Sequence, residues 1–115
     1  MSCVFECDGG AAVSHHEVAN HAYRIAQEAV NNAMKHASAR RLWIRLAHAG
    51  GRVRLCVEDD GVGLRSREGR NEGMGLRIME YRARLIGAAL EIGPRDGGGV
   101  RVVCEFSGAP PEIAG

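Results

Sequence analysis

Apolar and polar residues alternate in several short segments of the chain, which is the pattern of half-buried β-strands. In residues 40–49, for example, Leu42, Ile44 and Leu46 fall on one face. Turns that contain several glycines follow two of these segments, so we expect two β-hairpins. The predicted strands are residues 3–7, 40–49, 52–59, 89–93 and 99–106.

Two segments have the periodicity of helices. The first begins after Ser14, a residue suited to an N-cap, with Glu17 placed to complete a capping box, and continues to about Ala37. The second covers residues 76–87 and ends at Gly87. The resulting order β-α-β-β-α-β-β predicts an α/β fold, a two-layer sandwich with helices on one face of a mixed sheet.

Length and charge narrow the possible functions. With 115 residues, 45% of them apolar and 25% charged, the chain is expected to form one domain over residues 1–107 and a disordered tail at 108–115. Fifteen basic and fourteen acidic residues leave a formal net charge of +1. This balance removes the electrostatic argument for nucleic acid or an acidic membrane as the main partner. The chain shows neither a long apolar run nor a signal peptide, so a cytoplasmic location is expected.

The four cysteines are spread along the chain without a Cys-x-x-Cys pair. Cys3 and Cys7 would share one face of a strand, but Cys56 and Cys104 are not placed as a second pair to complete a metal site. We therefore expect all four to be small apolar core residues in a reducing compartment.

The first predicted helix carries an unusual polar face within RIAQEAVNNAMKHA (24–37). On a helical wheel with about 100° per residue, Asn32 and Lys35 lie within about 60° of Glu28, and His36 lies about 80° away. A solvated face would also be polar, but such a face usually carries Glu–Lys pairs. This one combines a carboxylate, carboxamides, an ammonium and an imidazole. Those groups can provide a general base, an oxygen ligand for a hard cation, and a phosphate partner.

Two Gly-x-Gly sequences follow. VEDDGVGL (57–64) places carboxylates and then glycines at the end of a strand, where glycine lets the backbone turn sharply and approach a ligand. EGMGLRIM (72–79) opens the second helix, whose first N–H groups and positive dipole end suit a phosphate. This second sequence is not a Walker loop, because no Gly-Lys-Ser/Thr follows, and it is not a Rossmann fingerprint, which would follow the first strand.

In this order and spacing, these motifs resemble the ATP-binding catalytic domain of bacterial sensor histidine kinases, in the GHKL ATPase superfamily with its Bergerat fold. RIAQEAVNNAMKHA resembles the N box, DDGVG the first glycine box and GMGL the second. With RIMEYRARLIGA after a short lid, the chain is most similar to the subfamily whose partners are helix-turn-helix response regulators. The resemblance covers nearly all of residues 3–106.

The resemblance implies a role for each motif. Asn32 would give its side-chain oxygen to a Mg²⁺ that bridges the ATP phosphates, and Glu28 would be the base that activates the nucleophile. Lys35 and His36 would lie near the phosphates, and Asp59 would accept a hydrogen bond from the adenine amino group. The glycine boxes would complete the ATP site, the first at the adenine pocket and the second over the phosphates, with Gly61, Val62, Gly63, Gly73, Met74, Gly75 and Leu76.

The same resemblance assigns a lid and marks one departure from the family. Residues 64–72, which include Arg65, Arg67 and Arg70, would form the ATP lid. Where the family usually has Gly-Thr at the start of the last strand, this chain has Val100, so one polar contact near the base would be lost.

A histidine kinase also needs a dimerisation segment that carries the phosphoacceptor histidine, and we expect it to come from elsewhere. His16-Glu17 is interpreted as helix capping rather than as a phosphoacceptor pair. The implied function is Mg-ATP-dependent phosphoryl transfer to that segment, followed by a response regulator. The domain itself would make no membrane contact, although it can be the cytoplasmic portion of a membrane-anchored sensor. Two alternatives stay open: a stand-alone anti-sigma-factor serine kinase, and a nucleotide-binding module that does not catalyse.

Overall fold

The computed structural model describes residues 2–7, 16–36, 39–63 and 72–107. Its elements follow the predicted order β-α-β-β-α-β-β: β1 (Ser2–Cys7), α1 (His16–His36), β2 (Arg41–Ala49), β3 (Arg52–Asp59), α3 (Glu72–Leu85), β4 (Ala89–Pro94) and β5 (Val100–Ser107). The predicted N-cap Ser14, the helix end Ala37 and the tail at 108–115 lie outside the described residues.

The five strands form one mixed sheet in the order β1-β2-β3-β5-β4. β1 is parallel to β2, and the other neighbours are antiparallel. The predicted hairpins are present, and Gly50 and Gly51 join β2 to β3 with φ angles of 58° and 79°. Glycine adopts such positive angles without steric cost, which explains the Gly-Gly sequence at this turn.

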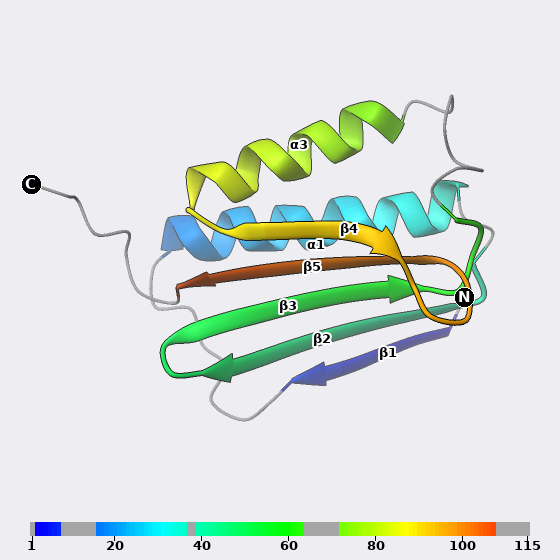
Figure 1. Ribbon diagram of the computed structural model, residues 1–115, viewed down its shortest axis with the longest axis horizontal. Helices are drawn as coiled ribbons and strands as arrows, with labels where there is room; N and C mark the ends of the chain where they lie inside the picture. The colour runs from blue at the N-terminus through cyan, green and yellow to red at the C-terminus, as the bar shows by residue number, and fades with distance from the viewer. Residues whose placement is uncertain (1, 8–15, 37–38, 64–71, 108–115) are drawn as a thin grey trace, which may run out of the picture.

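The two helices pack against each other on one side of the sheet and run in opposite directions (Figure 1). Arg82 of α3 lies with its Nη1 atom 3.1 Å from Nδ1 of His21 on α1, which links the two helices. α1 buries a stripe of mainly small residues against the strands, so its backbone can lie close to the sheet. The buried stripe consists of Val18, Ala22, Ile25, Ala29 and Ala33, and it packs with Val53, Val57, Val102 and Phe106. The fold is therefore the predicted two-layer α/β sandwich.

The second helix begins earlier than predicted. The expected range was 76–87, but α3 starts at Glu72. The second Gly-x-Gly sequence therefore forms the first turn of α3, and Glu72 belongs to this helix and not to the lid. Glycine is a poor helix former, and the packing of this turn against α1, described below, outweighs that tendency.

The expectation that all four cysteines belong to the core is half right. Cys56 and Cys104 are buried in the central strands, and burial raises the pKa of the Cys104 thiol to about 11. Cys3 and Cys7 are exposed, because β1 is an edge strand whose residues are all exposed. Within the described residues, no group of three or more His, Cys, Asp and Glu side chains is arranged to hold a metal ion. No helix in that part of the chain is long and apolar enough to cross a membrane.

Candidate functional site

A pocket lies where α1, the end of β3 and the start of α3 meet. The side chains of Asn32, Asp59 and Leu76, three residues predicted from the sequence, line it together. The other lining residues are apolar: Ala29, Val57, Met79, Ile92, Val100 and Val102. The N box, the first glycine box and the second glycine box thus contribute to a single site.

Asp59 is the polar centre of this pocket. It is the one charged residue among those described that is buried, with 3% of its surface exposed. Its Oδ1 atom accepts a hydrogen bond from the N–H of Gly61 at 2.9 Å, which couples the carboxylate to the turn that follows β3. A buried carboxylate at the end of an apolar pocket suits a ligand with a hydrogen-bond donor on an otherwise apolar ring.

The apolar wall is built by a row of residues across three strands. Val57 pairs with Val102, and Val102 pairs with Ile92 of β4. These three residues were not among the site residues predicted from the sequence. Alternation along β3 places Val57 on the same face as Asp59, two positions before it. The positions of Val102 and Ile92 beside it follow only from the register of β5 with β3 and of β4 with β5.

α1 and α3 meet at Gly75, which is buried. A Cβ atom at this position would lie 3.3 Å from Oε2 of Glu28 and 3.3 Å from Oδ1 of Asn32. Both distances are tighter than ordinary van der Waals contact, so a side chain at Gly75 would press on the two polar side chains of α1. The structure therefore brings Glu28, Asn32 and the second glycine box together.

The other predicted residues lie around this centre. Gly61, Val62 and Gly63 follow β3, and Val62 is 36% exposed. Lys35 is exposed near the end of α1 and does not line the pocket. His36 ends α1, and Gly73 and Met74 lie in the first turn of α3, but the side chains of His36 and Met74 lie outside the described residues, as do Arg65, Arg67 and Arg70 of the predicted lid.

Gly99, which was not among the site residues predicted from the sequence, lies close against the backbone of Asp59 on the β5 side. Its φ angle is 102°, and a Cβ atom there would overlap the carbonyl oxygen of Asp59. Val100, the departure from the family pattern, is the partner of Asp59 across β3 and β5 and is buried in the pocket wall. The Gly97-Gly98-Gly99 run predicts a turn, but only the pairing of β3 with β5 shows which glycine touches Asp59.

Comparison with known proteins identifies the family of the chain. The family model described as histidine kinase-, DNA gyrase B-, and HSP90-like ATPase matches residues 17–110. The nitrate/nitrite sensor protein NarX of Escherichia coli is 34% identical over 86 residues, which are 75% of this chain and 14% of NarX. Sensor histidine kinase LiaS of Bacillus subtilis is 30% identical over 95 residues, 83% of this chain and 26% of LiaS. The chain thus spans only a small part of the length of these relatives.

Solved structures share the fold. The blue-light activated histidine kinase EL346 of Erythrobacter litoralis has a TM-score of 0.75 and 26% identity, over 92% of this chain and 35% of that chain. The ATP-binding domain of PrrB from Mycobacterium tuberculosis has a TM-score of 0.64 and 22% identity, over 78% of this chain and 68% of that domain. The second likeness concerns the fold alone.

Proposed function

Because the chain belongs to the family of histidine kinase-, DNA gyrase B- and HSP90-like ATPases, we propose that it is the ATP-binding catalytic domain of a two-component sensor histidine kinase. The observation that carries the proposal is the single pocket in which Asp59, Asn32 and the start of α3 meet. Such a domain works in the cytoplasm, where ATP is available.

The deep part of the pocket takes the adenine ring. Asp59 accepts a hydrogen bond from the adenine amino group, and the apolar row that contains Val57 and Val102 contacts the ring. Gly61, Val62 and Gly63 form the rim of this part. Apolar walls with one well-placed polar group are typical of small-molecule sites.

The mouth of the pocket takes the phosphates. Asn32 presents a neutral carboxamide oxygen there, a ligand type that fits Mg²⁺. The ion, once bound, neutralises phosphate charge. The first turn of α3, with Gly73, Met74, Gly75 and Leu76, directs helix N-terminal N–H groups to the same region. Lys35 supplies positive charge near the end of α1, His36 lies near the phosphates, and the 64–71 segment with its arginines is the lid.

The chemistry is transfer of the γ-phosphoryl group from ATP to a histidine on a separate dimerisation segment. A P–N bond forms to the acceptor imidazole, the bond to the ADP oxygen breaks, and Glu28 accepts the proton that the imidazole loses. Glu28 lies beside Asn32 at Gly75, so the base and the phosphate site are adjacent. A response regulator then receives the phosphoryl group. Catalysis of this kind depends mainly on positioning and charge neutralisation.

The proposal is tested by mixing the chain, Mg²⁺ and ³²P-labelled ATP with a dimerisation segment that carries the acceptor histidine. We expect acid-labile label on that segment, and its loss when the acceptor histidine is replaced by Gln. Because the histidine must come from the partner segment, the chain alone should bind ATP without labelling itself. Acid-stable label on the serine of an anti-anti-sigma protein, with none on the histidine, would favour the serine-kinase alternative.

One observation favours a second candidate, a nucleotide-binding module that does not catalyse. Val100 lines the pocket beside Asp59, where the family pattern has a hydroxyl-bearing threonine. Labelling assays on the original chain and on Val100→Thr separate the two candidates. In a catalytic domain this change should raise ATP affinity and leave the labelling rate at saturating ATP nearly unchanged. If the protein binds ATP and neither form labels any partner, the module is non-catalytic.

A further inference from the structure

The residue after the buried carboxylate extends the β2–β3 ladder with its side chain. Asp60 Oδ1 accepts a hydrogen bond from the N–H of Arg41 at 2.8 Å and one from the N–H of Arg40 at 2.9 Å. The N–H of Asp60 also donates to the carbonyl of Arg41 at 3.3 Å. The last residue pair of the ladder is Leu42 with Asp59. A carboxylate therefore takes the place of a backbone carbonyl in the next step of the ladder.

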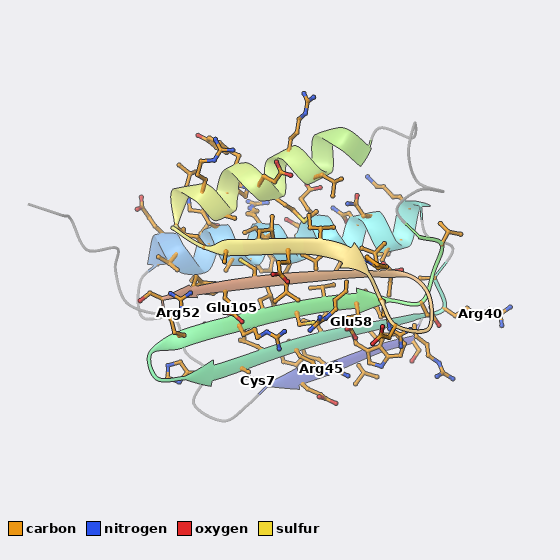
Figure 2. The ribbon with its side chains drawn as sticks, in the orientation of Figure 1. Cys7, Arg40, Arg45, Arg52, Glu58 and Glu105 are labelled. Carbon is orange, nitrogen blue, oxygen red and sulfur yellow. The ribbon has the colours of Figure 1, made fainter. Side chains whose placement is uncertain are left out.

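This side-chain cap joins three strands at the end of the sheet that carries the pocket. The carbonyl of Arg40 accepts a hydrogen bond from the N–H of Ser2 at 2.8 Å, so β1 is tied to the same peptide segment. The side chain of Arg40 extends away from the sheet in Figure 2, so its contribution is made by its backbone. The main chain can leave the sheet after Asp60 and turn toward Gly61 while the strand end stays bonded.

We infer that Asp60 is a positioning residue that fixes the depth and direction of the Asp59 carboxylate in the nucleotide pocket. This inference rests on the proposed role of Asp59 as the acceptor for the adenine amino group. Gly99, just before β5, lies so close to the Asp59 backbone that no Cβ atom would fit between them, and Asp60 holds the adjoining peptide to β2. With the chain fixed on both sides of the Asp59 peptide, the carboxylate meets the adenine at one depth only. Misplacement of a positioned group by about 1 Å is enough to weaken its interaction strongly.

The experiment compares Asp60→Ala, which removes the acceptor, with Asp60→Asn, whose carboxamide oxygen can accept both N–H groups. Asp96→Ala, at an exposed position in the β4–β5 turn, is the control. Calorimetry should show an ATP affinity about tenfold lower for Asp60→Ala and within about twofold of the original for Asp60→Asn. The preference for ATP over GTP should also fall in Asp60→Ala, because GTP lacks the amino group that Asp59 recognises. A purely structural cap would lower stability without changing this preference.

Hydrogen exchange at the Arg40 and Arg41 amides tests the cap without any nucleotide. Exchange should be faster in Asp60→Ala and close to the original in Asp60→Asn. If Asp60→Ala does not fold, Asp60→Ser, which has a shorter acceptor, takes its place. An unchanged ATP affinity and ATP-to-GTP preference in folded Asp60→Ala would overturn the inference. Failure of the unmodified chain and of Asp96→Ala to bind ATP would instead overturn the proposed function.

Discussion

The end of β3 carries two neighbouring carboxylates that face opposite sides of the sheet. On the outer face, Glu58 lies 3.1 Å from Arg101, 3.5 Å from Arg45 and 3.8 Å from Arg95. On the helix face, Asp59 is buried among apolar side chains and bonds to the backbone N–H of Gly61. The two residues have the same chemical group, but Glu58 is ion-paired to arginines, whereas Asp59 is buried in an apolar pocket beside Asn32.

The outer face is a network of matched charges. Figure 2 shows Glu58 and Arg45 on adjacent strands of this face, and Arg95 also lies over the ring of Trp43, 4.2 Å from its centroid. The guanidinium groups already satisfy Glu58, so this carboxylate is suited to holding strands together. The surroundings of a carboxylate, and not its position in an acidic motif, therefore distinguish a binding residue from a structural one.

The largest effect is expected where Asp59 meets the backbone of β5. Gly99→Ala should lower the free energy of unfolding by about 2–4 kcal/mol and abolish ATP binding, because the new methyl group overlaps the Asp59 carbonyl and φ is positive. Gly98→Ala is a matched control, since its φ is 110° but nothing lies within 4 Å of the added atom. Urea unfolding and calorimetry on both variants measure the difference. Equal losses in the two variants would mean that strain alone matters and that Gly99 does not hold Asp59.

The next largest effect is expected when the carboxylate of Asp59 alone is replaced. Asp59→Asn should weaken ATP binding by about 1–3 kcal/mol, because an amide can present N–H₂ where the ligand needs an acceptor. Inorganic triphosphate with Mg²⁺ should bind nearly as before, since the phosphates contact other residues. Calorimetry with both ligands is the measurement. ATP binding of normal strength by a folded Asp59→Asn protein would remove Asp59 as the adenine residue.

A smaller loss is expected at the mouth of the pocket. Asn32→Ala should remove the part of ATP affinity that depends on Mg²⁺, about 1–2 kcal/mol if one charge-assisted contact is lost. Asn31→Ala removes the adjacent carboxamide, which does not line the pocket, and serves as the control. ATP titrations with Mg²⁺ and with EDTA measure this part. An unchanged Mg²⁺ dependence in Asn32→Ala would show that another residue holds the ion.

The sequence predicted the fold well because both periodicities are strong. The strands 40–49 and 52–59 alternate clearly, and the alanine stripe of α1 has helical spacing. The α3 boundary was harder, because glycine propensity argues against a helix at Gly73 and Gly75. The contact of Gly75 with Glu28 and Asn32 is tertiary and is not visible in a local pattern.

The motifs of the site could be predicted from the sequence, but the backbone contacts that position its residues could not. The order of the motifs places Asn32 and Asp59 in one site through the resemblance. By contrast, nothing in the sequence indicated a role for Asp60, the second residue of the acidic pair. Its hydrogen bonds to the N–H groups of Arg40 and Arg41 depend on the register of β2 with β3.

An effect smaller than that of Asn32→Ala is expected on the outer face of the sheet. Glu58→Gln should lower the free energy of unfolding by less than about 1 kcal/mol at low salt, because the paired arginines are partly exposed to solvent. High salt should shrink this difference, since exposed charges are screened. ATP affinity should stay within error of the original chain. A loss of ATP binding as large as that of Asp59→Asn would contradict the division between the two faces.

The smallest effect is expected for the Asp60→Asn variant of the third carboxylate and should be visible only in acid. The hydrogen bond from the Arg41 N–H, with that from Arg40, holds the pKa of Asp60 below its ordinary value of 3.8. Folding thus favours the charged form, so this contribution to stability is fully present well above pH 3.8 and is lost as the pH falls below it toward the lowered pKa. Asp60→Asn keeps an acceptor that does not titrate, so its unfolding free energy should fall less steeply between about pH 5 and pH 2. Urea unfolding across this range measures the slopes, with Asp96→Asn as the control for loss of one surface carboxyl group. Parallel slopes for Asp60→Asn and the unmodified chain would show that the Asp60 hydrogen bonds do not depend on its charge.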